Sequence, residues 1–239
     1  MGRTVAACAK NGGKAEIVAG IDAKNDADAF SFPVFQEPAE ADEKADVLID
    51  FSNPSLLTPL LDYGVARNLP LVLCTTGYSR EQVLEIKKTA ARIPVFFSGN
   101  MSLGVNLLIE LSKKAAQVLG DSFDIEIIEK HHNRKLDAPS GTALMIADSI
   151  SSVLGKDMHY VYDRHSQRKA RESTEIGIHS VRGGTIVGEH DVIFAGPHEV
   201  LTLSHSAQSR DIFALGALHA AEFLSCQANG LYSMSDLLK

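Results

Sequence analysis

The stretch LPLVLCTTGYSREQVLEIKKTAARIPVFFSGN, residues 69–100, has an apolar segment at each end and a polar segment between them. The apolar segments, 69–77 and 93–100, are continuous, which is typical of parallel strands buried on both faces. A helix is expected between them from Ser79, because Ser79 and Gln82 have the spacing of a capping box. A strand, a helix and a second strand in this order predict a βαβ unit.

Two further apolar segments, 16–22 and 45–52, extend this pattern toward the N-terminus. The four segments together predict an α/β domain with a Rossmann-like parallel sheet. Ligands of such sheets bind beyond the carboxyl ends of the strands. We therefore expect a ligand near the residues that follow the four segments, which are Asp22, Ser52, Asn53, 75–77 and 98–100.

After residue 102 the pattern changes to helices and strands that are grouped apart. A helix is predicted over about 102–119, a strand over 122–129 and a second helix from near Ser140. Two or three antiparallel strands are predicted over 176–204, with turns at glycines near 183 and 196. This grouping predicts an α+β domain over 103–209, inserted into a first domain that comprises 1–102 and 210–239.

The composition narrows the function classes. The chain has 239 residues, a formal net charge of −7 and a pI of about 5.7, which argues against a nucleic-acid-binding surface. Cys8, Cys74 and Cys226 are far apart and form no CxxC pair, which indicates reduced thiols in a cytoplasmic protein. No apolar run is long enough to span a membrane, and the N-terminal residues do not resemble a signal peptide.

Positive charge is concentrated in the stretch EIIEKHHNRKLDAPSGTA, residues 126–143. The cluster follows the strand predicted over 122–129, and the Asp137-Ala138-Pro139 segment predicts a turn after it. Ser140, Gly141 and Thr142 then offer backbone N–H groups at a helix start, where anions bind. The stretch predicts a pocket for a small polyanion, most simply a carboxylate, with His131 able to donate a proton near neutral pH. Its cationic or titratable residues are Lys130, His131, His132, Arg134 and Lys135.

Two other interpretations of the cluster remain open from the residues alone. A charged run is often only a solvated surface. A metal site is disfavoured, because Arg134 and Lys135 would repel a cation and because zinc prefers histidines spaced along one helix face or paired cysteines. We therefore expect no metal.

The full pattern of the stretch resembles the signature of the dihydrodipicolinate reductases, the 4-hydroxy-tetrahydrodipicolinate reductases of bacterial lysine and diaminopimelate synthesis. The signature positions are Glu126-Ile127-x-Glu129-x-His131-x-x-x-Lys135-x-Asp137-x-Pro139-Ser140-Gly141-Thr142-Ala143. The likeness extends over most of the chain, including segments 49–54, 75–77, 100–106, 181–196 and 205–210.

The resemblance implies a dinucleotide-binding domain over 1–102 and 210–239 and a domain for substrate and tetramer formation over 103–209. It implies transfer of a hydride from NADH or NADPH to C4 of a ring derived from a small cyclic dicarboxylate, in a cytoplasmic homotetramer with no nucleic-acid or membrane partner. By position, His131 corresponds to the proton donor of the family and Lys135 to its catalytic lysine. The residues expected to bind the substrate carboxylates are His132, Ser140, Gly141, Thr142 and Arg210.

On the cofactor side, Met1 and Gly2 resemble the end of the glycine-rich turn of the family, and Asp22 stands where an acid binds the adenosine ribose. Lys24 leaves NADPH open beside NADH. Cys74 occupies a position where the family usually has Gly. The other residues expected to line the cofactor cleft are Thr75, Thr76, Ser98, Gly99, Asn100 and Met101.

The strand that precedes this turn in the family is absent from the sequence. Burial of about four apolar side chains in such a strand contributes roughly 6–12 kcal/mol. We therefore expect weak nucleotide binding and a frayed first domain. The leading hypothesis is the reductase. The alternatives are a catalytically silent dicarboxylate-binding or assembly protein of the same family, and a metal hydrolase built on His131 and His132.

Overall fold

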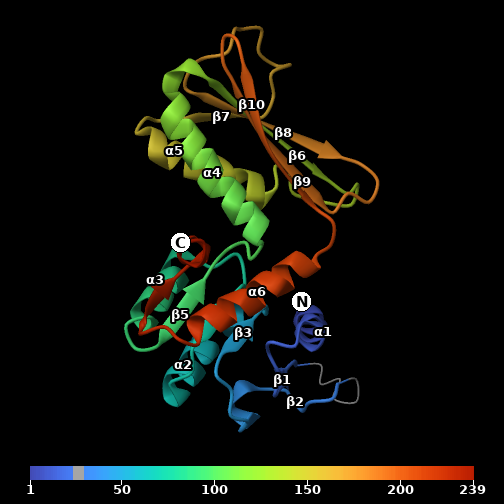
Figure 1. The fold of residues 1–239 in the computed structure, drawn as a ribbon, viewed down its shortest axis with the longest axis vertical. Helices are drawn as coiled ribbons and strands as arrows, with labels where there is room; N and C mark the ends of the chain where they lie inside the picture. Colours follow the sequence, from blue (N-terminus) through green and yellow to red (C-terminus); the bar gives the residue numbers. More distant parts are fainter. Residues whose placement is uncertain (24–29) are drawn as a thin grey trace. The chain divides into compact units, whose positions relative to one another are not determined.

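The computed structural model describes residues 1–23 and 30–239, so Lys24 lies outside the described residues. The described chain forms two compact units. Unit 1 comprises Met1–Leu103 and Asp211–Lys239, and unit 2 comprises Gly104–Arg210. Figure 1 shows the elements of each unit in the colours of the sequence.

Unit 1 has a parallel sheet with helices on both faces. The sheet order is β11 (Gly230–Tyr232), β5 (Pro94–Phe97), β4 (Leu71–Leu73) and β3 (Leu48–Asp50), and all neighbours are parallel. Its helices are α1 (Gly2–Gly12), α2 (Leu57–Arg67), α3 (Arg80–Thr89), α6 (Asp211–Leu224) and α7 (Met234–Leu237) (Figure 1).

Successive residues of β4 point to opposite faces of the sheet, and helices cover both faces. Leu71 and Leu73 pack with the α2 and α3 residues Leu57 and Ile86. Val72, which points the other way, packs against α6 residues that include Ala217 and Leu224. Burial on both faces explains why these strands are continuous apolar runs, and it confirms the predicted Rossmann-like arrangement.

The N-terminal part of unit 1 differs from the predicted strand over 16–22. There, β1 (Gly20–Ile21) pairs in parallel with β2 (Val34–Phe35) in a separate two-stranded sheet. Helix α1 packs against α6. The 3-10 helices η2 (Pro38–Glu40) and η3 (Pro54–Leu56) complete the described part of this unit.

Unit 2 is a five-stranded sheet with two helices. The sheet order is β10 (Val200–Ala207), β9 (Gly188–Ala195), β6 (Asp124–His131), β8 (Glu175–Arg182) and β7 (His159–Val161). The helices are α4 (Leu103–Leu119), which is followed by η4 (Gly120–Ser122), and α5 (Gly141–Leu154). In the core, apolar side chains of β6, β8 and β9 pack against residues of α4 and α5 such as Leu108 and Ile146. Figure 1 shows α4 and α5 beside the sheet that contains these strands.

The predicted order of strands in this sheet was wrong in one respect. Residues 176–204 were expected to form a run of adjacent antiparallel strands, but β6 lies between β8 and β9. Strand β8 runs parallel to β6, and β9 runs antiparallel to it. The physical reason is that β6 lies inside the sheet, where its backbone N–H and C=O groups need a partner strand on each side. The turn after β8 therefore crosses the end of β6, where the Gly183 N–H donates to the His131 carbonyl at 2.9 Å.

The predicted helix starts, which depend on residues close together in the sequence, were confirmed. Ser79 and Gln82 form the capping box at α3. Ser140 is the N-cap of α5, and its hydroxyl accepts a hydrogen bond from the Ala143 N–H at 3.1 Å. The short strands β2, β7 and β11, of two or three residues, were missed because they are too short to show a period.

Candidate active site

His131 is the last residue of β6, and its position follows from the alternation of that strand. Ile125, Ile127, Glu129 and His131 share one face, the first two in the core and the last two at the end of the sheet. Across the ladder His131 is paired with Arg182 of β8. On the β9 side it lies over Gly188, where an added Cβ would stand 3.1 Å from His131 Nε2.

Glu129 is the buried charge of this site, with no exposed side-chain surface. Its carboxylate accepts two hydrogen bonds from the Arg182 guanidinium, at 2.7 and 2.8 Å. Glu129 Oε2 lies 2.6 Å from His131 Nδ1, and Oε1 accepts the Ser140 N–H at 3.1 Å. A buried carboxylate is stable only with such partners, and here they come from Arg182, His131 and Ser140.

These contacts set the charges of the pair. Burial by itself would raise the pKa of Glu129, but hydrogen bonds from Arg182, Ser180 and His131 outweigh it and lower the pKa to about 2. Burial lowers the pKa of His131, and the hydrogen bond to Glu129 opposes that shift. Glu129 is therefore ionised at neutral pH, whereas burial favours the neutral form of the His131 ring.

A second histidine, His190 of β9, lies beside the first. The rings of His131 and His190 are 5.3 Å apart in an edge-to-face arrangement. His190 Nε2 lies 3.0 Å from the Ser140 hydroxyl, and its Nδ1 has no hydrogen-bond partner among the residues that the structure describes. Burial, followed by the charge of His131, lowers the pKa of His190 to about 4, so this ring is neutral.

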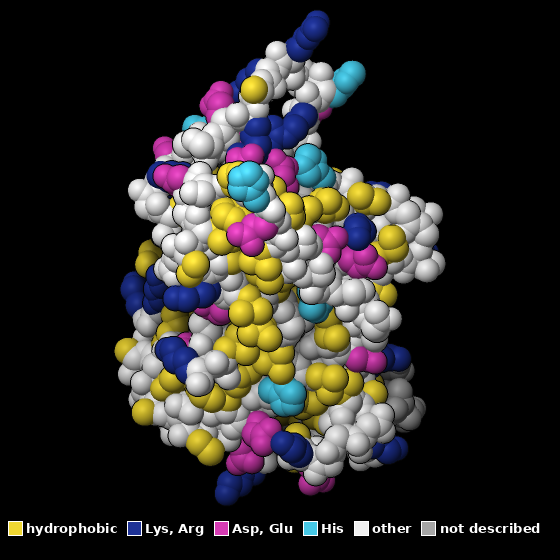
Figure 2. Space-filling model, turned by 45° about the horizontal axis from the view of Figure 1, so that its top comes forward, with side chains coloured by type: hydrophobic (Ala, Val, Ile, Leu, Met, Phe, Trp, Pro, Cys, Tyr) yellow, Lys and Arg dark blue, Asp and Glu magenta, His cyan; other side chains and the backbone are white. Residues whose placement is uncertain are grey.

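The predicted cationic cluster is only partly brought together. Lys135, largely buried, forms an ion pair with Asp137 at 2.9 Å in the loop before α5. Lys130 points to the opposite face of β6, where it pairs with Glu189 at 3.2 Å and Asp191 at 3.0 Å. The prediction that Lys130 lies in the anion pocket was wrong, because successive residues of a strand point to opposite faces of the sheet. Figure 2 shows acidic and basic side chains interspersed with histidines over this unit.

The other substrate-binding predictions lie at the same end of the sheet. Gly141 and Thr142 form the first turn of α5, and an added Cβ on Gly141 would meet nothing within 4 Å. His132 is half-buried, and its Nδ1 has no hydrogen-bond partner within the described ranges 1–23 and 30–239. Arg210 is exposed and follows β10, whose Ala207 pairs with Gly188.

In unit 1, the residues expected to bind a cofactor gather at the carboxyl ends of β3, β4 and β5. The carboxylate of Asp50, which is buried, accepts hydrogen bonds from the Thr75 hydroxyl at 2.8 Å and the Tyr78 hydroxyl at 3.2 Å. The Ser98 N–H donates to the Leu73 carbonyl at 3.4 Å. Thr76 and Gly99 are exposed in the same loops, and Asn100 is buried.

The other residues expected to bind the cofactor differ in which of their groups a ligand can reach. Met1 and Gly2 begin α1, and Asp22 directly follows β1 and is exposed. The side chains of Cys74 and Met101 are packed in the core against α6, so only their backbone groups are available to a ligand.

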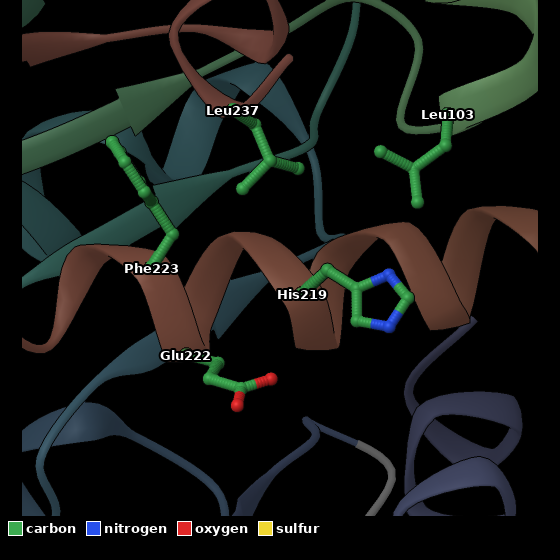
Figure 3. A pocket seen from close by; sticks show the side chains of 5 residues that line it. All are labelled: Leu103, His219, Glu222, Phe223 and Leu237. Atoms are coloured by element: carbon green, nitrogen blue, oxygen red, sulfur yellow. The ribbon is translucent and has the colours of Figure 1, made fainter. Parts of the chain in front are cut away.

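One hollow of unit 1 lies apart from these residues. It has a volume of about 350 Å³ and is lined by Leu103, His219, Glu222, Phe223 and Leu237. Figure 3 shows His219, Glu222 and Phe223 projecting from α6, with Leu103 and Leu237 opposite. None of the predicted site residues lines it. Within the described part of the chain, no three His, Cys, Asp or Glu side chains are grouped to hold a metal, and no helix could cross a membrane.

Comparisons with known proteins agree with this architecture. Residues 1–101 match the family model "Dihydrodipicolinate reductase, N-terminus", and residues 104–238 match "Dihydrodipicolinate reductase, C-terminus". The chain belongs to the dihydrodipicolinate reductase family. The change from the first match to the second falls where the chain passes from unit 1 into unit 2, and the second match continues through unit 2 into residues 211–238 of unit 1.

Individual relatives cover nearly the whole chain. The 4-hydroxy-tetrahydrodipicolinate reductase of Caldanaerobacter subterraneus subsp. tengcongensis is 55% identical over all of this chain and 94% of the relative. That of Clostridium novyi is 48% identical with the same coverage. A dipicolinate-bound dihydrodipicolinate reductase from Paenisporosarcina sp. TG-14 has a TM-score of 0.80 at 26% identity, covering 97% of this chain and 92% of that one.

Three residues of the site were given no role by the predictions from the sequence. Glu129 was a signature position without a role, and Arg182 and His190 were not singled out. One signal was available for Glu129, because a carboxylate on the apolar face of a strand needs a buried partner. For Arg182 and His190 the necessary information was the strand order, which the sequence did not provide.

Proposed function

We propose that the chain catalyses the NAD(P)H-dependent reduction of 4-hydroxy-tetrahydrodipicolinate to tetrahydrodipicolinate, in the synthesis of diaminopimelate and lysine. Membership of the reductase family supports this, and so do relatives of that name over the full length of the chain. The observation that carries the proposal is the His131 imidazole, 2.6 Å from the buried Glu129 carboxylate and close to the start of α5.

The substrate class fits the charges of unit 2. A small cyclic dicarboxylate needs cationic groups and backbone N–H groups to bind its two carboxylates. Lys135, His132 and the first turn of α5 at Gly141 and Thr142 supply these at one end of the sheet. Arg210 follows β10 at the same end and is exposed, so it is available for the second carboxylate. The structure in the family bound to dipicolinate supports this class of ligand.

The residues of unit 1 fit a nicotinamide dinucleotide. Thr75 and Thr76 follow β4, and Ser98 and Gly99 follow β5, at the edge where parallel sheets bind ligands. Gly2 begins α1, whose first N–H groups suit a pyrophosphate. Asp22 follows β1 and suits a ribose hydroxyl pair. When bound, NADH or NADPH supplies the hydride.

The chemical role of unit 2 is to hold the ring and deliver a proton. Reduction with loss of the hydroxyl group as water consumes one proton for each hydride. We assign the proton to His131 Nε2, because Nδ1 is occupied by Glu129. Lys135 holds a carboxylate of the ring and keeps positive charge beside the histidine, which assists release of the proton.

The experiment follows NADH oxidation with substrate generated by the preceding synthase. His131→Ala is expected to lower kcat by about 10²–10⁴-fold with little change in NADH affinity. Lys135→Ala is expected to lower kcat and raise KM together. His198→Ala, at an exposed turn of the same unit, serves as the control. Wild-type kinetics in either site variant would refute the role of that residue.

No observation favours the alternative of a catalytically silent binding or assembly protein, or that of a metal hydrolase. The expected weak nucleotide binding stays a prediction. A titration with NADH, of this chain and of the relative from Caldanaerobacter, tests it, and equal affinities would contradict it.

We also propose a homotetramer. Strand β10 is an eight-residue edge strand with the apolar side chains Val200 and Leu201 exposed, at 63% and 40%. A long apolar edge of this kind normally pairs with another chain. Light scattering at several concentrations tests this, and a monomer throughout would exclude it. We propose the cytoplasm as its location, because its three cysteines, all in the described ranges, are free thiols.

A further inference from the structure

Glu129 connects the two halves of the proposed substrate site. One carboxylate oxygen, Oε2, contacts His131 Nδ1 at 2.6 Å. The other, Oε1, accepts the Ser140 N–H at 3.1 Å, at the N-cap of α5. The same carboxylate therefore touches the proposed proton donor and the helix start that is proposed to bind the substrate carboxylates.

Arg182 fixes this carboxylate from the neighbouring strand. Its two terminal nitrogens donate to both oxygens of Glu129, at 2.7 and 2.8 Å. One of them also donates to the Asp137 carbonyl at 2.7 Å, and the other to the Val181 carbonyl at 2.8 Å. The pair thus holds the loop before α5 at two points, Asp137 and Ser140. A planar guanidinium with both nitrogens engaged allows the carboxylate little rotation.

The contact with Glu129 determines which nitrogen of His131 carries the reactive proton. All the acceptor positions of Glu129 are filled by donors, so the carboxylate is ionised and has no proton to give. Nδ1 of His131 must therefore carry a hydrogen in both charge states of the ring. Nε2 is then the only position at which His131 gains or loses a proton.

We propose that Glu129, held by Arg182, is a positioning residue that fixes the tautomer and orientation of His131 and ties them to the start of α5. The inference rests on the proposed function, in which His131 donates the proton. It adds a residue that touches neither substrate nor cofactor and acts through His131 and Ser140. A carboxylate that orients a catalytic histidine in this way occurs on unrelated folds.

Charged and titratable groups face His131 from each element around it. Glu129 is on its own strand, Arg182 is on β8, His190 is on β9, and Lys135 is in the loop that follows. Only Glu129 is negative. Removing its charge therefore makes protonation of His131 harder, and the remaining charge of Arg182 acts in the same direction.

The first test compares Glu129→Gln with Glu129→Asp. In Glu129→Gln the amide N–H₂ group faces either His131 or Arg182, so one of these contacts is lost. We expect kcat to fall by at least about 10²-fold. We also expect the alkaline limb of the kcat profile, where His131 loses its proton, to move down by about 1–3 pH units. Glu129→Asp keeps the charge and is expected to lie closer to wild type in both measurements.

Glu110→Gln is the matched control, since Glu110 forms an ion pair with Lys113 at 3.0 Å on the surface of α4 in the same unit. It is expected to keep the wild-type pH profile. A fall in kcat without a displaced alkaline limb, in a Glu129→Gln variant that melts like wild type, would contradict the positioning role.

The second test needs no variant. Nitrogen-15 NMR of histidine-labelled wild-type protein reports which ring nitrogen carries hydrogen. We expect His131 to be protonated at Nδ1 and bare at Nε2 above its pKa, whereas free histidine favours hydrogen on Nε2. A neutral His131 with hydrogen on Nε2 would overturn the inference, whether or not Glu129→Gln folds.

The outcomes separate this inference from the proposed function. If His131→Ala keeps full turnover, the proposed function of His131 fails first. If His131→Ala is inactive while Glu129→Gln keeps the wild-type rate and pH profile, His131 stands as the proton donor and the role of Glu129 is refuted.

Discussion

Asp50 of unit 1 is a buried carboxylate that organises the loop after β4 in the way that Glu129 organises unit 2. It accepts hydrogen bonds from the Ser52 N–H, the Thr75 hydroxyl and the Tyr78 hydroxyl. Burial, together with the negative charge of Asp50, raises the pKa of Tyr78. The Tyr78 hydroxyl therefore stays protonated and remains a donor to Asp50 at all physiological pH values.

Removing this hydroxyl should cost more than removing a similar one elsewhere. Tyr78→Phe keeps the ring against Phe97 but leaves a charged acceptor short of a donor, which costs about 1.5–3 kcal/mol of unfolding free energy. Tyr63→Phe is the control, because the Tyr63 hydroxyl donates to the neutral Ala41 carbonyl, and about 0.5–1.5 kcal/mol is expected. Urea unfolding measures both. Equal losses of unfolding free energy in the two variants would show that the hydrogen bond to Asp50 stabilises the fold no more than the one to Ala41.

Single residues were predictable from sequence where their roles depend on near neighbours. Ser79 was identified as a helix cap, and a helix was expected to start near Ser140, because the cap of a helix contacts an N–H three residues ahead. Lys130 was assigned to the wrong face, because the strand was expected to end before it. The structure extends β6 through His131, and the alternation then places Lys130 opposite.

At the scale of elements, the sequence predicted whether each long segment is a helix or a strand. It did not predict which segments lie next to each other in the sheet. Strand β6 was recognised from the sequence, but not its position between β8 and β9, since its pairing joins residues about 50 to 70 apart. The central position of β6 is what brings Arg182 and His190 to Glu129. The network of the site therefore follows from strand order and could not be read from local patterns.

The packing of α6 gives a test at this scale. An added Cβ at Gly216 would lie 1.7 Å from the backbone oxygen of Met101, so α6 could not keep its place against the segment after β5. We expect Gly216→Ala to lower the unfolding free energy by about 1–3 kcal/mol. Gly12→Ala, at an open position of α1, should instead raise it by about 0.5–1 kcal/mol. A stabilising Gly216→Ala would contradict the close approach.

At the scale of the whole molecule, the buried carboxylates Asp50 and Glu129 have surroundings of different kinds. Asp50 is surrounded by hydroxyl and amide donors, whereas Glu129 lies among Arg182, His131 and His190. Acid should therefore affect unit 2 more, because in it the buried ring of His190 and the largely buried ring of His131 stand beside a buried ion pair. The formal charge of −7 by itself does not reveal this difference.

The sign of the acid effect follows from His190. Its pKa falls from 6.5 to about 4 on folding, so between these values the unfolded chain binds a proton that the folded chain does not. Stability is complete above about pH 6.5 and is lost as the pH falls toward 4, by about 1.4 kcal/mol per unit. Glu129, with a pKa near 2, adds a further loss below about pH 4.5. From about pH 7.5 to about pH 5, His190 alone should cost roughly 2 kcal/mol.

Urea unfolding, with hydrogen exchange of β9 amides to report on unit 2, measures this loss at the two pH values. His190→Asn should reduce the difference by roughly 2 kcal/mol, because no imidazole is left at that position to take up a proton on unfolding. His198→Asn, at an exposed turn, should keep the wild-type difference. The same pH dependence in His190→Asn as in wild type would mean that His190 does not resist protonation in the folded state. The acid sensitivity of unit 2 would then have to come from His131 and His205, whose pKa values are also lowered by burial.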